Sequence, residues 1–487
     1  MVRDLSESRA VPLWARVVDV LCVLLFGLGL VVAISGGFRQ SIGAIRFSVT
    51  SPLPLLLWAI GLAIVRHAAA PQHAVYREFP AAALRWLRRS EVRAAATTVV
   101  TTRVAILLVG CFAVYAFGYA TADVPLRLFD NEVLNLPIRW DAGWYLQIVT
   151  DGYRFAPDAP DIQQNIVFFP AYPLLVRLVG RLFGGHTPGY VAAGMAVSLA
   201  SFFGALLYLY ALGRDLVGDE RARYALWLIA SYPFAVFFGV IYTESLFLLA
   251  AVAAFYHMTK AQFGRAMVWG LLVGLTKTNG AALSIPLAML AISGRLRVAD
   301  AHLVSRFDPA VESPPQTTAA GRTGRAILAA AMPGVGLLIF TIFVWRLTGD
   351  PLAWARGQAA WGRTYEPITH VVGRQYSFIT HGGLNAYMAV GAYDVLNMLA
   401  AVFALAAVWP VARRLGAAYA VLILVVMVPP IATGGWLSVG RFSSVLFPVF
   451  VWLSASIPES QRNVWIVGFT AFQALNAALF FTWRPLI

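Results

Sequence analysis

The sequence contains few cysteines and few charged residues. Only two cysteines, Cys22 and Cys111, occur among 487 residues. Both lie in apolar runs, which excludes a disulfide framework and a cysteine-based zinc site. Charged residues make up 12% of the chain and hydrophobic residues 60%, whereas a soluble domain carries about twice that share of charge. The composition therefore excludes an ordinary soluble domain.

Acidic residues are fewer than basic ones, 23 against 37, which gives a formal net charge of +14. A basic balance of this size often accompanies nucleic-acid binding, but here the Lys and Arg residues are scattered between apolar runs and form no single basic face. This scatter is typical of topology signals and of contacts to anionic lipid. We therefore expect membrane lipid as a partner and no nucleic acid.

Apolar runs of membrane-spanning length recur along the whole chain, and the mean hydropathy is +0.72. This pattern predicts an all-α polytopic membrane protein with about 11–13 transmembrane helices, since the two runs around Asn279 are short. The expected spans lie near 17–35, 52–66, 103–122, 191–212, 224–241, 244–258, 266–276, 280–293, 326–347, 386–410, 417–432, 442–456 and 463–482.

The distribution of Lys and Arg predicts the topology. The apolar stretch that begins at Val17 is long for a signal-peptide core, so we expect an uncleaved anchor with a cytoplasmic N-terminus. Roughly 23 of the 37 basic residues then fall on the cytoplasmic side. This arrangement places the loops 123–190 and 348–385 outside, and it makes the polar segment 294–325 a cytoplasmic linker.

Two domains are expected from these features. Residues 1–95 form an N-terminal transmembrane hairpin followed by a basic cytoplasmic segment, whose Leu-Arg-Trp-Leu-Arg-Arg run fits a helix on an anionic membrane surface. The alternation in residues 45–49 indicates short extended structure at the hairpin tip. Residues 96–487 form the core, and all residues that suggest chemistry lie in it.

The loop 123–190 carries the residues most typical of an active site. Arg139-Trp140-Asp141-Ala142-Gly143-Trp144-Tyr145 places a carboxylate among aromatic side chains, and Phe168-Phe169-Pro170-Ala171-Tyr172-Pro173 follows. The periodicity predicts a short helix that starts near Asp141 and a second helix over 173–183, both lying along the membrane surface. Aromatic residues commonly line sugar and isoprenoid sites.

Sugar transfer from a polyprenyl phosphate needs a base for the acceptor hydroxyl and cations for the phosphate. Asp141 is the candidate base, and Arg139, Lys277 and Arg441 are the candidate phosphate contacts. Other interpretations remain open: Asp141 and Glu244 also fit helix caps, and the three cations also fit interfacial anchors. Trp354 and Trp436 fit an aromatic belt.

Several ordered motifs, over about residues 100–455, resemble the PIG-V family of mannosyltransferases within the GT-C glycosyltransferase superfamily. Arg139-Trp140-Asp141-Ala142 resembles its first-loop signature and Val167-Phe168-Phe169-Pro170-Ala171-Tyr172-Pro173 its second. Later blocks are Ser231-Tyr232-Pro233, Tyr242-Thr243-Glu244-Ser245, Thr276-Lys277-Thr278-Asn279-Gly280, Trp361-Gly362-Arg363 and Gly440-Arg441-Phe442. Lys277 stands where the family usually has Arg, which keeps the charge but loses the bidentate fork.

The resemblance implies a GT-C-like helical bundle, a polyprenyl-phosphate sugar donor (mannose), a membrane-associated acceptor, no cofactor and no metal. It implies inverting transfer on the outer face of a bacterial cytoplasmic membrane, with Asp141 as the catalytic acid/base residue. The substrate-binding residues that it suggests are Arg139, Trp140, Trp144, Tyr145, Tyr172, Glu244, Lys277, Asn279, Arg363 and Arg441.

Three alternatives belong to other classes of protein. A transporter or flippase of lipid-linked glycans would gather polar residues or paired broken helices near the bilayer midplane, and here the polar features lie at span ends. A protein O-mannosyltransferase would differ only in the acceptor, which the sequence does not identify. A non-catalytic scaffold would leave the Trp-Asp loop unexplained.

Overall fold

The apolar runs of the chain form helices, because a helix satisfies all of its backbone hydrogen bonds internally in a medium without water. The computed structural model describes residues 11–35, 38–42, 45–49, 51–70, 74, 84–120, 126–159, 161–293 and 319–484. The chain folds into two units, Met1–Arg93 with Val176–Ala193, and Ala94–Leu175 with Gly194–Ile487. The candidate site residues all lie in the second unit.

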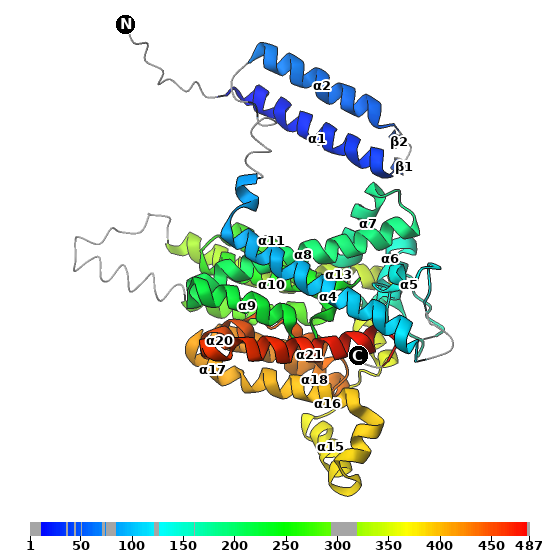
Figure 1. Ribbon diagram of the computed structural model, residues 1–487, viewed down its shortest axis with the longest axis vertical. Coiled ribbons are helices and arrows are strands. Elements are labelled where there is room, and N and C mark those ends of the chain that lie inside the picture. Colours follow the sequence, from blue (N-terminus) through cyan, green and yellow to red (C-terminus); the bar gives the residue numbers. More distant parts are fainter. Residues whose placement is uncertain are drawn as a thin grey trace, which may run out of the picture. The chain divides into compact units, whose positions relative to one another are not determined.

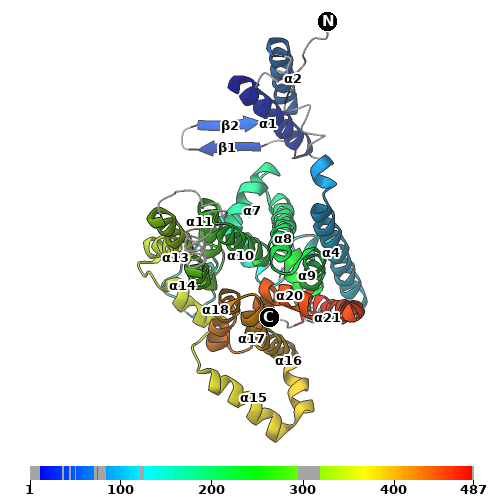
Figure 2. The same cartoon turned by 90° about the vertical axis from the view of Figure 1, so that its left-hand side faces the viewer.

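The first unit contains a helical hairpin. Helices α1 (Leu13–Ser35) and α2 (Pro52–Ala69) pack together, and the antiparallel strands β1 (Phe38–Ile42) and β2 (Ile45–Val49) connect them (Figures 1 and 2). The extended structure expected at residues 45–49 is confirmed.

A buried ion pair joins the two helices of this hairpin. Arg66 Nε lies 2.7 Å from Oδ1 of Asp19, and both side chains are fully buried. Arg66 Nη2 also donates to Oδ2 of Asp19 at 3.0 Å. This ion pair and its one hydrogen bond fix the pairing of α1 and α2, because either charge alone would be costly to bury.

Eight helices in the described residues are long and apolar enough to cross a membrane, which confirms an integral multi-pass membrane protein. Four further apolar helices in the described residues are shorter, at 10–17 residues. The long helices of the second unit are α4 (Ser90–Phe117), α8 (Thr187–Val217), α13 (Ala319–Thr348), α16 (Leu384–Ala406) with α17 (Val408–Arg414), α18 (Ala417–Gly434) and α21 (Arg462–Phe481).

The shorter helices complete the bundle of the second unit. They are α9 (Asp219–Ser231), α10 (Glu244–Thr259), α11 (Phe263–Gly274), α19 (Val439–Ser444) and α20 (Phe447–Ser456), together with the apolar segment Thr278–Ser293. Helix α11 packs against α10 and α13, and α9 packs against α20 and α21 (Figure 1).

The predicted span 224–241 is not one helix. Helix α9 ends at Ser231, and the short 3-10 helix η2 (Ala235–Gly239) follows before α10 begins. Pro233 cannot donate a backbone hydrogen bond, so the helix is interrupted there. The break leaves backbone carbonyls without helical partners, and such groups are tolerated at membrane depth only where protein satisfies them.

Three buried side chains satisfy the carbonyls of this break. Arg103 Nη2 donates to Ala230 O at 2.6 Å, and Gln473 Nε2 donates to the same oxygen at 2.8 Å. Asn476 Nδ2 donates to Pro233 O at 3.0 Å. The three donors come from α4 and α21. They hold the break that precedes Tyr242 and Glu244.

The helices expected in loop 123–190 are confirmed. The loop contains α5 (Glu132–Asn135), α6 (Ala142–Asp151), the 3-10 helix η1 (Asn165–Val167) and α7 (Ala171–Leu182). Leu174, Leu178 and Leu182 of α7 are exposed, as expected of a helix that lies along a membrane surface.

The second loop contains α14 (Ala353–Arg356), the 3-10 helix η4 (Gly357–Trp361) and α15 (Ile368–Gly382). Most of the expected linker 294–325 lies outside the described residues. Residues 319–325 instead form the first turns of α13, because the small and basic side chains there do not interrupt a helix.

Candidate functional site

The candidate base lies in an unusual turn before α6. Trp140 has a φ of 53°, a left-handed conformation that is uncommon for a large residue. Its Nε1 donates to Phe480 O at 3.3 Å, and its ring packs 5.2 Å from that of Trp483. The backbone N–H of Asp141 donates to the hydroxyl of Tyr242 at 3.0 Å. These contacts hold the turn in place.

Asp141 precedes α6, but its side chain does not cap the helix. Its Oδ2 instead accepts from Nη1 of Arg441 at 2.5 Å. The interpretation of Asp141 as a capping residue therefore does not apply to its side chain. Because Arg441 occupies one carboxylate oxygen, the other remains for a second partner.

Four charged side chains form what we call the charge cluster: Asp141, Glu244, Lys277 and Arg441. Lys277 Nζ lies 2.5 Å from Oε1 of Glu244, and Arg441 Nε lies 3.3 Å from the same oxygen. Arg441 thus bridges the two carboxylates. The Asp141 side chain is 16% exposed and that of Glu244 only 1%, so Asp141 is the carboxylate that a substrate can reach.

Three cationic side chains lie close to the ring of Phe442. Lys277 Nζ lies 5.0 Å from the ring centroid, Arg363 Cζ 5.5 Å and Arg441 Cζ 5.6 Å. An aromatic face attracts cations, and here it holds them close together despite their repulsion. Among the described residues no carboxylate lies within 4 Å of the Arg363 guanidinium. The charge cluster and Arg363 together contain three cations and two carboxylates, which gives a net charge of about +1.

Burial changes the protonation of these cations. It lowers the pKa of Lys277 to about 8, although the charge of Glu244 opposes this effect. Burial and the neighbouring Arg441 lower the pKa of Arg363 to about 10. For Arg441, burial alone would lower the pKa, but Asp141 and Glu244 outweigh it and raise the pKa. Arg441 is therefore the permanently charged centre of the group.

Aromatic rings form one wall beside Asp141. The ring of Trp144 lies 5.2 Å from that of Trp361 and 6.1 Å from that of Phe168. Tyr145 packs edge-on against Phe168 at 5.1 Å and against Tyr172 at 5.5 Å. The wall combines the two aromatic motifs of loop 123–190 with the Trp-Gly-Arg motif of the second loop.

Several buried polar atoms of the site have no hydrogen-bond partner among the described residues. They are Glu244 Oε2, Asn279 Oδ1 and Trp361 Nε1. Buried polar atoms are nearly always paired, so unpaired ones at this place fit a site that a ligand completes.

Three of the expected binding residues, Arg139, Tyr172 and Asn279, lie outside the charge cluster and donate to backbone carbonyls. The guanidinium of Arg139 is fully buried and donates to Phe481 O at 2.9 Å and Asn135 O at 2.6 Å. The hydroxyl of Tyr172 donates to Gly194 O at 3.0 Å, and Asn279 Nδ2 donates to Val426 O at 3.5 Å. Among the described residues no hydrogen bond or ion pair joins these three side chains to the charge cluster, and Tyr172 packs against Tyr145 in the aromatic wall.

Three residues matter here that the sequence did not single out as site residues. Phe442 gathers the cations, Tyr242 receives the backbone N–H of Asp141, and Trp361 completes the aromatic wall. Each of the three lies in a motif that the sequence analysis quotes. The motif was therefore the signal in the sequence that could have identified the residue. Within the described residues, no group of three His, Cys, Asp or Glu side chains is placed to hold a metal ion.

Known proteins give two kinds of similarity. Solved structures similar to this chain include the oligosaccharyltransferase of Archaeoglobus fulgidus with zinc and sulfate, at 14% identity and a TM-score of 0.36. The apo form of that enzyme has 13% identity and a TM-score of 0.38. The match covers 80% of this chain but only 56% of the apo enzyme, so the chain spans about half the length of these structures. At these scores the likeness supports no conclusion about function.

No curated protein matches the chain. The profile of the family described as mannosyltransferase (PIG-V) matches residues 116–295, which include Asp141, Glu244 and Lys277 and make up less than half of the chain. The resemblance inferred from the motifs is thereby confirmed over this segment. Residues 116–295 of this membrane protein carry the sequence pattern of the PIG-V mannosyltransferases.

Proposed function

We propose that this protein is a membrane glycosyltransferase that moves a sugar, mannose, from a polyprenyl-phosphate donor to a membrane-associated acceptor on the outer face. The observation that carries the proposal is the position of Asp141. It is a reachable carboxylate that lies beside three clustered cations and an aromatic wall. The family match over residues 116–295 supports the reaction class.

The reaction is a single displacement. The acceptor hydroxyl oxygen attacks the anomeric carbon and forms the new glycosidic bond, while the bond between that carbon and the phosphate oxygen breaks. The electron pair of the broken bond goes to the phosphate, and the hydroxyl proton goes to the free oxygen of Asp141. A β-linked donor therefore gives an α-linked product.

The cations are suited to the departing phosphate. A polyprenyl-phosphate sugar carries one negative charge on its diester, and the leaving phosphate gains a second as the bond breaks. The single excess positive charge at Phe442 neutralises the bound donor, and Arg363 is its source because no carboxylate of the described residues lies within 4 Å of its guanidinium. A positive site of this kind stabilises charge that develops in the transition state.

Two hydrogen-bond partners hold Asp141 in one orientation. Arg441 fixes Oδ2, and Tyr242 fixes the backbone N–H. The carboxylate then presents its other oxygen in one orientation, which is what a base for a hydroxyl requires.

The test is donor binding and transfer by the purified protein in lipid nanodiscs made from native membrane lipid. Radiolabelled polyprenyl-phosphate mannose is expected to bind, and label is expected to move into a second lipid or glycan. Polyprenyl-phosphate glucose serves as the comparison for the sugar. If neither donor binds, the protein is not a transferase of this type.

A further inference from the structure

One buried cation of the second unit lies outside the segment that matches the family, residues 116–295. Arg103, in the long apolar helix α4, is only 3% exposed. Among the described residues no carboxylate lies within 4 Å of its guanidinium. An arginine inside a membrane span is costly, and such residues usually serve a function. The proposed displacement does not use Arg103.

The guanidinium of Arg103 joins the two sides of the helix break at Pro233. Its Nη2 donates to Ala230 O of α9 at 2.6 Å, and its Nη1 donates to Ala235 O, at the first residue of η2. Its Nε donates to Thr102 Oγ1 at 3.3 Å. Because the nitrogens of a guanidinium have a fixed planar geometry, the two Nη groups set the spacing of the two carbonyls. A lysine has a single nitrogen and no such fork.

The stem of Arg103 lies close to the other end of η2. A Cβ at Gly239, the last residue of η2, would lie only 3.3 Å from Cδ of Arg103. The guanidinium carbon also lies 5.1 Å from the ring centroid of Phe202, and an aromatic face attracts a cation. Arg103 is therefore placed against η2 at both its first and its last residue.

The break packs against α19, the helix that carries Arg441. A Cβ at Gly440 would collide with the ring of Phe234, so this ring lies directly against the backbone of α19. The hydroxyls of Tyr232 and Ser443 share a hydrogen bond of 2.7 Å. Two residues of the break thus contact α19 on either side of Arg441.

The segment after the break contacts Arg441 itself. Arg441 Cζ lies 5.9 Å from the ring centroid of Phe237, in η2, and 5.6 Å from that of Tyr242. The two rings pack 5.2 Å apart. The hydroxyl of Tyr242 accepts from the backbone N–H of Asp141 at 3.0 Å. A shift of η2 would therefore reach both partners of the ion pair between Asp141 and Arg441.

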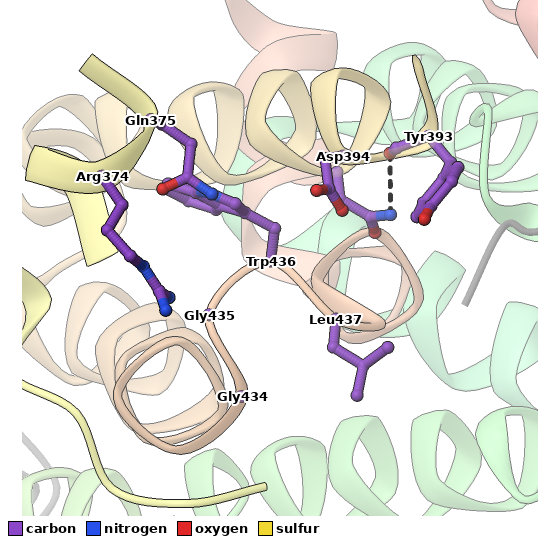
Figure 3. Close-up of a pocket in the computed structure, with 9 residues that line it drawn as sticks. Arg374, Gln375, Tyr393, Asp394, Gly434, Gly435, Trp436 and Leu437 are labelled. Carbon is purple, nitrogen blue, oxygen red and sulfur yellow. Dashed lines mark hydrogen bonds between the residues drawn. The ribbon is translucent and has the colours of Figure 1, made fainter. Parts of the chain in front are cut away.

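Helix α19 is also held by α16. Asn397 Oδ1 accepts from the backbone N–H of Gly440 at 2.7 Å. Asn397 Nδ2 donates to Tyr393 O at 3.0 Å, the dashed line in Figure 3. These bonds fix α19 relative to α16, whereas the position of α19 relative to η2 depends on the break that Arg103 bridges.

We propose that Arg103 is a positioning residue of the transferase. By bridging the break it sets the place of η2 relative to α19, and so the geometry in which Arg441 holds Asp141. The inference rests on the proposed function. Arg103 acts through the backbone, since its hydrogen bonds go to Thr102 and to the two carbonyls at the break. A displacement of about 1 Å at a reacting group lowers a rate about a hundredfold, so a smaller displacement is enough to be measured.

The first pair of variants is Arg103→Lys and Gln473→Leu, each in nanodiscs of native membrane lipid. The lysine keeps the positive charge and loses the fork. Gln473 donates to Ala230 O at 2.8 Å and to Tyr232 O at 3.0 Å. Both carbonyls precede the proline of the break, so Gln473→Leu perturbs the same break without removing a hydrogen bond to η2.

The second pair is Gly239→Ala and Gly264→Ala. Gly239→Ala keeps Arg103 and places a methyl group against its stem. Gly264, in α11, is the matched control, because a Cβ there would meet open space. This pair tests the inference without changing any charge.

The first measurement is hydrogen–deuterium exchange of the backbone amides of residues 235–242. Arg103→Lys is expected to speed this exchange at least about tenfold, because η2 loses a hydrogen bond from a charged group. Gln473→Leu is expected to stay within about twofold of the wild type in these residues. The exchange is read without any turnover.

The second measurement is a single turnover of radiolabelled polyprenyl-phosphate mannose that is already bound. Arg103→Lys is expected to lower the rate constant at least about tenfold, and Gly239→Ala about threefold. The dissociation constant of the donor is expected to stay within about twofold, and both controls are expected to match the wild type. The rate constant does not depend on the fraction of folded protein, so a loss of stability alone leaves it unchanged.

Three results overturn the inference. The first is a wild-type exchange rate and rate constant in Arg103→Lys. The second is an equal loss in Gln473→Leu, because the break as a whole would then be responsible. The third is a loss of donor binding in Arg103→Lys, because the arginine would then serve the donor site.

Two further outcomes are also decisive. If Arg103→Lys does not fold, Gly239→Ala decides, and a wild-type rate constant in that variant overturns the inference. A wild type that neither binds nor transfers the donor contradicts the proposed function, whereas the exchange of residues 235–242 still shows whether Arg103 holds η2.

Discussion

Nη1 of Arg441 lies 2.5 Å from Oδ2 of Asp141, although 300 positions of sequence separate the two residues. Nε of the same arginine lies 3.3 Å from Glu244. One guanidinium therefore organises both carboxylates of the site. This bridge places the proposed base, Asp141, beside the proposed phosphate site at Phe442.

Arg441→Gln is expected to abolish transfer and to destabilise the fold. Breaking a largely buried ion pair leaves uncompensated carboxylates, which costs about 3–5 kcal/mol. Thermal unfolding in detergent and donor turnover are the two measurements. Arg462→Gln is the matched control, because it breaks an ion pair with the exposed Glu220, and exposed pairs contribute little to stability. Equal losses of stability in both variants would contradict the bridging role.

Tyr242→Phe is expected to slow transfer about fivefold while donor binding is kept. The variant removes the hydroxyl that accepts from the Asp141 N–H at 3.0 Å, and one such hydrogen bond contributes about 1 kcal/mol. Tyr224→Phe is the control, since its hydroxyl donates to Arg462 O away from the site. Turnover that Tyr242→Phe leaves untouched would mean that the turn at Asp141 does not depend on this contact.

The rate of transfer is expected to fall as the pH rises above about 8, the pKa of Lys277. Neutral Lys277 no longer balances Glu244, and the excess positive charge for the phosphate is lost. Lys277→Arg is expected to keep activity to higher pH, because an arginine in this place stays charged. Its neighbours Glu244, Asp141, Arg363 and Arg441 are unchanged in the variant.

The stability of the fold changes with pH in the opposite direction to the expected rate, so a loss of activity caused by Lys277 can be told apart from unfolding. The pKa of Lys277 is lower in the folded protein than its ordinary value of 10.5. The unfolded chain therefore binds more protons between about pH 8 and 10.5, so this group makes the fold more stable as the pH rises. A loss of activity that tracks the unfolding temperature in this range would contradict the role given to Lys277.

The local parts of the structure could be predicted from the sequence. The helices α6 and α7 begin within two residues of their expected positions, because periodicity and capping signals are local. The break after Ser231 was missed, since the apolar run continues through Pro233 and only Arg103, Gln473 and Asn476 from distant helices make the break tolerable.

The site was predictable as a set of residues but not as an arrangement. Motif order named Asp141, Glu244, Lys277, Arg363 and Arg441, and the structure brings these five together. Arg139 follows the same pattern in sequence, yet its guanidinium is directed to backbone carbonyls. Side-chain direction depends on packing between distant helices, which a single sequence does not display.

The central claim is that Asp141 removes the proton of the acceptor hydroxyl. Asp141→Asn keeps the size of the side chain and removes its basicity. Arg441 keeps Glu244 as a partner in this variant, so folding and donor binding are expected to remain. The measurement is transfer of label from radiolabelled polyprenyl-phosphate mannose in native membranes that contain the wild type or this variant. The account predicts a labelled product from the wild type and a rate at least about a hundredfold lower from the variant. Equal transfer by both would contradict the assignment of Asp141 as the base.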